Sequence, residues 1–368
     1  MRIQALHIYQ RDLPVVGGPF RMASATVECL DTTILEVVTD QGMAGYGETC
    51  PLGPIYQPQH ALGARAALQE MAPRLVGQNP LYLEQIRAAM DSSLTGSAYA
   101  KAAVDMACWD ILGKASRARV CELLGGPFQE EIPSYASIAV LPPDQAADAV
   151  REQCRRGFKR VQLKVGGRSL DQDIEAIKKA AEAIEPGVGL VVDANRGWNR
   201  REARLVSQQC RDVACAFEQP CSSYEEILSL RGKIEHPVLL DESAEDTACI
   251  LRAIADGAAD GFSLKCTRVG GLSAMRTIRD VCRTVRLPIT CDDSWGGDVA
   301  AAACLHIAAT VEPRLLDGVW IAEPFIREHY DSENGPRIQE GRIRLPHGPG
   351  LGVVPNRSML GHPLLSYG

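Results

Sequence analysis

The feature that most constrains the fold is a series of short apolar runs between residues 158 and 320, each ending in a charged residue or a tryptophan. The runs recur every 23 to 29 residues, which is the length of one strand, one helix and two short loops. Their last residues, in order, are Lys164, Asp193, Glu218, Asp241, Lys265, Asp292 and Trp320. Such a rhythm is typical of βα units around a parallel sheet, with a first strand expected at 133–140.

In a closed (β/α)8 barrel the C-terminal ends of the strands meet at one mouth. Two lysines and three carboxylates of the series would then surround one pocket. Carboxylates that lie so near one another repel each other in a partly dry site unless a cation lies between them. The pattern therefore predicts a hard divalent ion with oxygen ligands, most simply Mg²⁺.

Composition excludes several other classes of protein. The 368 residues carry a net charge of −7 with scattered basic residues, which argues against a nucleic-acid partner. The 13 cysteines include no Cys-x-x-Cys pair, which favours reduced thiols. The start lacks the apolar core of a signal peptide, and no run of about 18 apolar residues exists. We expect a cytoplasmic protein with no membrane partner.

The first 125 residues have a different pattern from the rest. Alternating apolar and polar residues predict strands at 2–12, 31–39 and 46–48. Apolar residues at helical spacing predict helices at 61–71, 81–94 and 98–114. The loop at 15–20 is either a lid or an ordinary connection. We expect a domain over 1–125, completed by the tail 330–368 and its strand at 342–345, and a barrel domain over 126–329.

On the motifs that hold these strand-end residues, the chain resembles the enolase superfamily, in the muconate-lactonising-enzyme subgroup, over essentially its whole length. Lys164 stands in Gln-Leu-Lys-Val-Gly-Gly, Asp193 in Val-Asp-Ala-Asn, Glu218 in Phe-Glu-Gln-Pro and Asp241 in Leu-Asp-Glu-Ser, while Lys265 precedes Arg-Val-Gly-Gly-Leu. The resemblance implies an α/β fold, a modified TIM barrel (β/α)7β with an N-terminal α+β capping domain. It also implies an essential Mg²⁺ held by Asp193, Glu218 and Asp241.

One position departs from the subgroup, which typically carries Lys-x-Lys on the second strand. Gln162 replaces the first of these lysines. Its neutral amide can bond a substrate carboxylate, or it can act as a spacer behind the pocket wall.

The chemistry expected of this arrangement is removal of a proton from the carbon next to a carboxylate. Mg²⁺ on that carboxylate favours the negative charge that develops there. Lys164 and Lys265, on opposite faces, would remove one proton and return another, which inverts the carbon as an isomerase of the racemase or epimerase type does. The ion and the opposed amine are expected to lower the pKa of the basic lysine.

Further stretches resemble the superfamily members that act on proline derivatives: 51–56 followed by 61–65, 291–298 and 318–320. The resemblance implies a small-molecule carboxylate with a cyclic ammonium. The implied reaction is 2-epimerisation or racemisation of hydroxyproline betaine or proline betaine, with dehydration of cis-3-hydroxy-L-proline as the alternative. Members of the superfamily commonly form oligomers, so a homo-oligomer is expected.

A betaine carries a quaternary ammonium, which proteins usually bind on aromatic faces. Tyr56, Trp320 and Trp295 are candidates for that cage, although each can equally be a hydrophobic wall. Asp292 or Asp293 can add a counter-charge, and alternation along a strand leaves open which of them faces inward. A non-catalytic solute-binding barrel is the remaining alternative. It predicts the loss of a metal carboxylate or a lysine, and none is missing.

Overall fold

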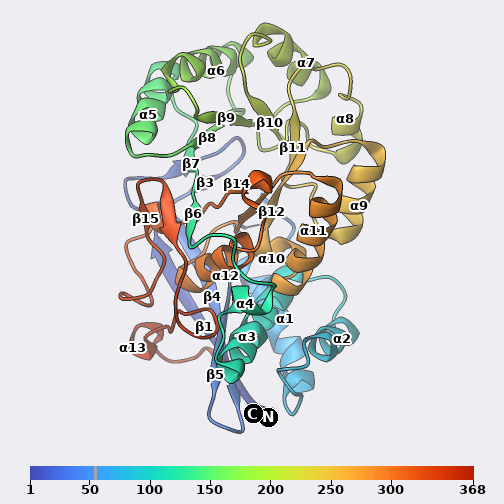
Figure 1. The fold of residues 1–368 in the computed structure, drawn as a ribbon, viewed down its shortest axis with the longest axis vertical. Coiled ribbons are helices and arrows are strands. Elements are labelled where there is room, and N and C mark those ends of the chain that lie inside the picture. Colours follow the sequence, from blue (N-terminus) through green and yellow to red (C-terminus); the bar gives the residue numbers. More distant parts are fainter. Residues whose placement is uncertain (54–55) are drawn as a thin grey trace.

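The computed structural model describes residues 1–53 and 56–368 and shows a parallel barrel joined to a smaller layer (Figure 1). Pro54 and Ile55, part of the stretch predicted to face the substrate, lie outside the described residues. The smaller layer, called the cap below, comprises the N-terminal antiparallel sheet, its helices and the hairpin that extends from it.

The barrel is one sheet of eight strands, all parallel, in the order β14-β13-β12-β11-β10-β9-β8-β7. The strands are β7 (Ala136–Ile138), β8 (Arg160–Lys164), β9 (Gly189–Asp193), β10 (Ala216–Glu218), β11 (Val238–Leu240), β12 (Gly261–Lys265), β13 (Ile289–Asp292) and β14 (Leu316–Gly318). The edges meet where the Tyr135 amide donates to the Val319 carbonyl at 3.2 Å. The predicted (β/α)7β barrel is thereby confirmed.

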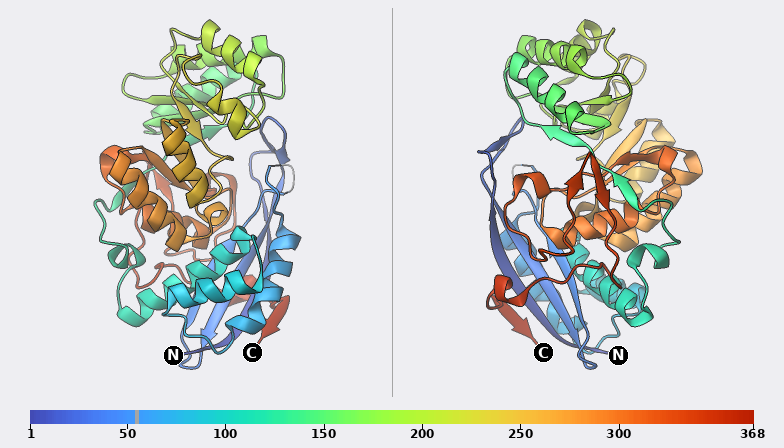
Figure 2. Two further views of the ribbon diagram at one scale, coloured as in Figure 1. Left: turned by 90° about the vertical axis from the view of Figure 1, so that its right-hand side faces the viewer. Right: turned by 60° about the vertical axis from the view of Figure 1, so that its left-hand side comes forward.

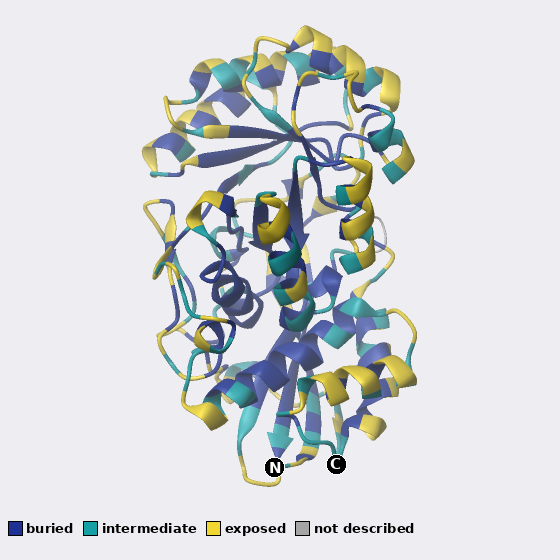
Figure 3. Ribbon diagram, turned by 45° about the vertical axis from the view of Figure 1, so that its right-hand side comes forward, coloured by how far each residue is buried: buried dark blue, intermediate teal, exposed yellow. Residues whose placement is uncertain are grey.

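Helices follow the strands and cover the outside of the barrel (Figure 3). They are α5 (Pro143–Arg155), α6 (Leu170–Ala183), α7 (Arg200–Gln209), α8 (Tyr224–Leu228), α9 (Thr247–Asp256), α10 (Cys266–Val269), α11 (Leu272–Val285) and α12 (Asp298–Ala308). In α11 the buried residues recur at helical spacing, at Leu272, Met275, Ile278 and Cys282. Among the described residues, no helix is long and apolar enough to cross a membrane.

The cap sheet has the order β17-β1-β4-β5, with all pairs antiparallel. Its elements are β1 (Ile3–Pro14), β4 (Cys29–Thr39), β5 (Ala44–Thr49), β17 (Leu365–Tyr367), the hairpin β2 (Phe20–Arg21) and β3 (Thr26–Val27), and helices α1 (Ala61–Leu75), α2 (Leu83–Ser93) and α3 (Ala98–Ser116). The long strands β1 and β4 carry the hairpin toward the barrel (Figure 2). There the Val140 amide donates to the Arg21 carbonyl at 3.0 Å.

Helix α3 lies against the cap sheet at very short range. A Cβ atom on Gly47 would lie 1.8 Å from the Ala103 carbonyl oxygen, so only glycine fits there. Trp109 on the same helix is buried, and its indole donates to the Ser273 hydroxyl on α11 at 2.9 Å. Helix α3 is therefore packed on both sides, which explains its many small residues.

The C-terminal tail divides between the two layers. Of the described strands in the tail, β17 alone pairs with the cap sheet, through β1. The strand expected at 342–345 is β16 (Arg342–Arg344), which pairs with β15 (Ile338–Gln339) and with β6 (Glu131–Pro133) beside the barrel. The single strand expected at 133–140 is consequently two elements, β6 and β7, because residues before Ser134 pair with the tail. The domain bounds stay a prediction.

A buried carboxylate joins the cap to α12. Glu48 on β5 accepts from the Gly297 amide at 2.7 Å and the Ala300 amide at 3.0 Å, at the N-terminus of that helix. It also accepts from the Thr32 hydroxyl at 2.8 Å. Anions are favoured at helix N-termini, where backbone amides lack partners.

We predict that Glu48→Ala lowers the free energy of unfolding by roughly 2–4 kcal/mol, because it leaves several buried donors without an acceptor. Urea denaturation followed by circular dichroism measures this loss. Glu48→Gln keeps an acceptor oxygen and should cost clearly less. Equal stability of the alanine variant and the parent protein would contradict the assigned role.

Candidate active site

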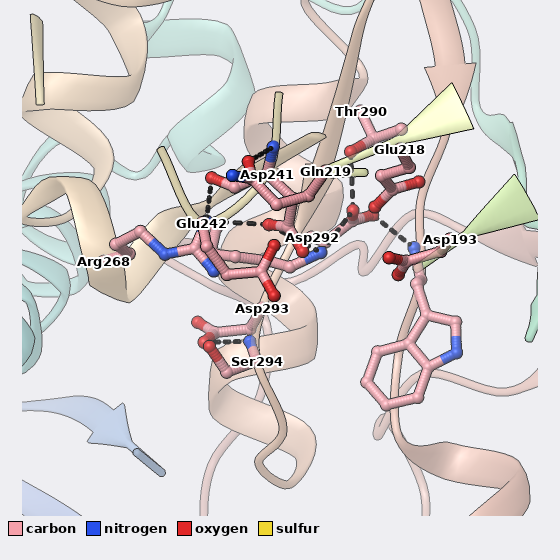
Figure 4. Close-up of polar contacts among 12 residues, drawn as sticks. Asp193, Glu218, Gln219, Asp241, Glu242, Arg268, Thr290, Asp292, Asp293 and Ser294 are labelled. Carbon is pink, nitrogen blue, oxygen red and sulfur yellow. Dashed lines mark hydrogen bonds and ion pairs between the residues drawn. The ribbon is translucent and has the colours of Figure 1, made fainter. Parts of the chain in front are cut away.

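Three carboxylates converge at the mouth of the barrel. Asp193 and Glu218 end β9 and β10, and Asp241 directly follows β11 (Figure 4). One oxygen from each lies within 4.8 Å of the others, and all three side chains are buried. Parallel neighbouring strands in register place their last residues side by side, as Asp193 and Glu218 are paired here.

The electrostatics of this cluster call for a cation. Burial and then repulsion from Asp193 and Asp241 raise the pKa of Glu218 to about 7. The Glu218 Oε1 atom is buried and accepts no hydrogen bond from any residue that the structure describes. Three hard oxygen donors and an unsatisfied lone pair fit Mg²⁺, which prefers carboxylate oxygens. The residues present therefore suit the ion predicted from the sequence.

The two lysines stand on opposite sides of the mouth. Lys164 ends β8 and Lys265 ends β12, and three strands separate β8 from β12 in either direction round the barrel. Both side chains line the same cavity. Lys164 forms an ion pair with Asp193, while the Lys265 Nζ atom lies 3.1 Å from Asp292 Oδ2 and 3.7 Å from Asp241 Oδ1.

The carboxylates around the two lysines shift the lysine pKa in the direction opposite to the one expected from Mg²⁺ and the opposed amine. Burial lowers the pKa of Lys164, but attraction to Asp193 and Glu218 outweighs it, so that the pKa is raised. Burial is likewise outweighed at Lys265, by Asp241 and Asp292, and its pKa is well above the usual value. The physical reason is the charge of the neighbouring carboxylates. A divalent cation among them opposes this attraction.

Several aromatic side chains line the cavity, alongside the lysines and other polar groups. They include Tyr56, Trp295 and Trp320, which the sequence singles out, together with Phe20 and Tyr135. The Trp295 and Trp320 rings pack edge to face, with centroids 5.1 Å apart. Phe20, from the hairpin, packs edge to face on Trp295 with centroids 5.6 Å apart. The segment considered as a lid or a connection thus leads into a hairpin that closes one side of the cavity.

Gln162 lines the cavity, but its amide is engaged with the protein. Its Nε2 donates to Glu218 Oε2 at 2.9 Å, and its Oε1 accepts from the Ser137 hydroxyl at 2.9 Å. In the structure the amide thus orients a carboxylate of the cluster. Because Gln162 also lines the cavity, both roles considered for it stay predictions.

The two consecutive aspartates have different surroundings. Asp293 lines the cavity, and its Oδ1 accepts from the Thr267 hydroxyl at 2.5 Å. Burial is the main reason that the pKa of Asp293 is raised to about 7. Asp292 is not part of the wall, because its carboxylate is taken up by Tyr135, Thr290, Lys265 and the Trp320 amide. Asp292 therefore holds Lys265 and the backbone just after β14 in place through hydrogen bonds.

Sequence reasoning missed some side chains around this site. Tyr135 lies within the predicted first strand, but nothing in the local pattern indicates that its hydroxyl reaches Asp292, at 2.8 Å. Arg268 belongs to the Arg-Val-Gly-Gly motif, yet its guanidinium donates to Asp241 Oδ1 at 2.7 Å. Both contacts join residues far apart in the chain, which explains why spacing alone does not reveal them.

Comparison with known proteins gives full-length matches. Residues 5–125 match the model of the mandelate racemase/muconate lactonizing enzyme N-terminal domain, and residues 145–359 match the enolase C-terminal domain-like model. A cis-3-hydroxy-L-proline dehydratase of Roseibium aggregatum is 38% identical, covering all of both chains. An N-succinyl-L-Arg/Lys racemase of Bacillus cereus is 26% identical over 98% of this chain and 97% of the other.

The crystal structure of an enolase superfamily member from Roseovarius nubinhibens, complexed with magnesium, superimposes on this chain with a TM-score of 0.95. It is 33% identical and covers 100% of this chain and 99% of its own. Together with the carboxylate cluster, these matches confirm Mg²⁺ as the cofactor.

We predict that Mg²⁺ raises the melting temperature of chelator-treated protein. An ion that binds only the folded state stabilises it by roughly 2.7 kcal/mol at a concentration of 100 times Kd. Differential scanning fluorimetry measures the shift. Asp193→Asn should lose most of it, whereas Asp212→Asn, at an exposed position, should keep it. The same shift in Asp193→Asn as in the parent would argue against this ion site.

Proposed function

Because the chain belongs to the mandelate racemase/muconate lactonizing enzyme family of the enolase superfamily, we propose that it is an Mg²⁺-dependent isomerase acting on a proline-type betaine. Its proposed reaction is inversion at C2 of hydroxyproline betaine or proline betaine. The family, the two lysines and the carboxylate cluster support removal of a proton next to a carboxylate. What we propose beyond this is the class of substrate and the inversion of its C2 carbon.

The observation that carries the substrate class is how few free hydrogen-bonding groups the cavity offers. The Tyr56 hydroxyl donates to Asp241 at 2.9 Å, and the Tyr135 hydroxyl donates to Asp292 at 2.8 Å. Ser294 exchanges a hydrogen bond with the Tyr99 hydroxyl at 3.1 Å. Apart from the two lysines and Asp293, the surface left for a ligand is then chiefly aromatic and apolar. A quaternary ammonium, which donates no hydrogen bond, suits such a wall.

Asp293 can supply the negative charge that this cation needs, because a bound cation opposes the burial that raises the pKa of Asp293 to about 7. Its carboxylate is buried beside Trp295 and Trp320 on the cavity wall. A cationic ring in contact with the two indoles would therefore have a carboxylate within the same low-dielectric pocket, where charge pairing is strong. We assign Asp293, Trp295, Trp320 and Tyr56 to substrate binding.

We assign the proton transfers to Lys164 and Lys265. When bound, Mg²⁺ supplies positive charge that favours the extra negative charge on a substrate carboxylate after proton removal. One lysine accepts the C2 proton at its Nζ atom, and the other donates a proton to C2 from the opposite face. Asp292 holds Lys265 in place, since its Oδ2 accepts from Nζ at 3.1 Å. Gln162 holds Glu218 by donating from its Nε2 to Glu218 Oε2 at 2.9 Å.

A second candidate is dehydration of cis-3-hydroxy-L-proline. It is favoured by the relative of that name, which is 38% identical over the full length. It is also favoured by the Asp293 Oδ2 atom, which is buried and has no hydrogen-bond partner among the described residues, so that it can accept from a secondary ammonium. In this ring the C2 proton and the 3-hydroxyl lie on opposite faces. Opposed lysines can therefore serve both reactions, one removing the proton and the other protonating the departing hydroxyl.

Proton NMR in deuterium oxide distinguishes the two candidates. We expect deuterium to appear at C2 of proline betaine or hydroxyproline betaine while signals of the other epimer grow. Cis-3-hydroxy-L-proline should persist under the same conditions. Its conversion to an unsaturated ring without any exchange into the betaines would overturn epimerisation in favour of dehydration.

Replacing one lysine at a time tests the assignment of roles. Lys164→Met and Lys265→Met should each slow epimerisation roughly 10²- to 10⁴-fold, the usual effect of losing a general acid or base. Each variant should still exchange the C2 proton of only one epimer, the one whose proton faces the remaining lysine. Lys233→Met, on the surface, should behave as the parent. Exchange of both epimers by a single-lysine variant would contradict the two-lysine scheme.

A further inference from the structure

The carboxylate of Asp241 has a partner on each of its oxygens, and one partner comes from the cap. Its Oδ1 accepts from Arg268 Nη1 at 2.7 Å, and its backbone carbonyl accepts from the same nitrogen at 2.6 Å. Its Oδ2 accepts from the Tyr56 hydroxyl at 2.9 Å. Arg268 Nη2 also donates to the Tyr56 oxygen, at 3.3 Å. The three side chains form a closed set in which neither carboxylate oxygen can move alone.

Arg268 sits where the barrel meets the cap. It belongs to α10, directly after β12, and it is buried (Figure 4). With its amide oxygen turned toward the guanidinium, Gln57 accepts from Arg268 Nε at 2.9 Å and from Nη2 at 2.7 Å. The guanidinium therefore contacts a barrel carboxylate through Nη1 and two residues that follow the cap sheet through its other nitrogens.

The cap packs closely against this part of the barrel. Helix α10 packs on α3, and a Cβ atom at Gly271 would lie 2.5 Å from the Asp105 carboxylate of that helix. Asp105 in turn accepts from the Ser273 amide at 3.0 Å, at the start of α11. A change in how the cap is seated would consequently move Arg268 and Tyr56.

The rotation of Asp241 matters because Mg²⁺ demands nearly ideal octahedral geometry. A carboxylate turned away from the ion is a poor ligand even when its backbone stays in place. Residues that hold metal ligands from behind typically change metal affinity 10- to 100-fold when they are replaced.

We propose that Tyr56 and Arg268 are positioning residues that form a clamp on Asp241 and link the Mg²⁺ affinity of the barrel to the seating of the cap. All three carboxylates of the metal site belong to the barrel, yet one of them is held by a residue from outside it. This inference concerns metal binding in the absence of substrate, so it does not rest on which proline derivative is turned over.

Isothermal titration calorimetry of the substrate-free protein with Mg²⁺ tests the clamp. Tyr56→Phe removes a single hydroxyl, and we expect Kd to rise about 10-fold. Arg268→Lys keeps the positive charge but loses the forked geometry, and should raise Kd by a similar factor. Because both residues act on one carboxylate, the double variant should lose less affinity than the product of the two factors.

Tyr135→Phe is the matched control. It removes a hydroxyl from the same cavity, but that hydroxyl donates to Asp292, which is no part of the carboxylate cluster, so Kd should stay within twofold. A Kd within twofold of the parent in Tyr56→Phe overturns the clamp. So does an equal loss in Tyr135→Phe, or losses in the double variant that multiply exactly. If Arg268→Lys fails to fold by circular dichroism, Tyr56→Phe and its control decide.

Discussion

The mutual repulsion of three buried carboxylates is the constraint on which the rest of this structure depends. Asp193, Glu218 and Asp241 lie too close together to remain ionised without compensating charge. The chain places basic groups against two of them, with Lys164 on Asp193 and Arg268 on Asp241. Glu218 has a weaker cationic neighbour and the raised pKa. A divalent cation would therefore offset the most uncompensated negative charge at Glu218.

A parallel barrel is well suited to this task because its geometry is set by backbone hydrogen bonds. The three carboxylates lie at the C-terminal ends of three consecutive strands: Asp193 and Glu218 are register partners, and Asp241 comes two residues after Leu239, the partner of Glu218. The same closure places β8 and β12 across the mouth from each other. The lysines therefore face one another over the site without any specific contact between them. The carboxylate cluster and the opposed pair of lysines thus arise from one architectural element.

The sequence predicts the barrel and the carboxylate cluster well, because both depend on the repeat length and on the last residue of each strand. The sequence does not predict which way a side chain points or which residues far apart in the chain pair with each other. Asp292 and Asp293 are neighbours in sequence, and only the structure shows that the first is turned toward Tyr135 while the second lines the cavity. The strand 342–344 pairs beside the barrel because its partner, β6, precedes the first barrel strand. Local patterns contain neither fact.

Under the proposed function, the composition of the cavity wall would determine which proline derivative binds. Most of its hydroxyl and amide groups serve to hold Asp241, Asp292 or Glu218, so orienting the machinery uses up the polar contacts that would otherwise recognise a substrate. Discrimination then falls to aromatic faces and to one carboxylate, Asp293, whose outer oxygen has no described partner. Methylation of the ring nitrogen changes the ligand from a hydrogen-bond donor to a purely electrostatic and aromatic contact. Under the proposed function, Asp293 and the indoles beside it would thus set the preference between these two kinds of ligand.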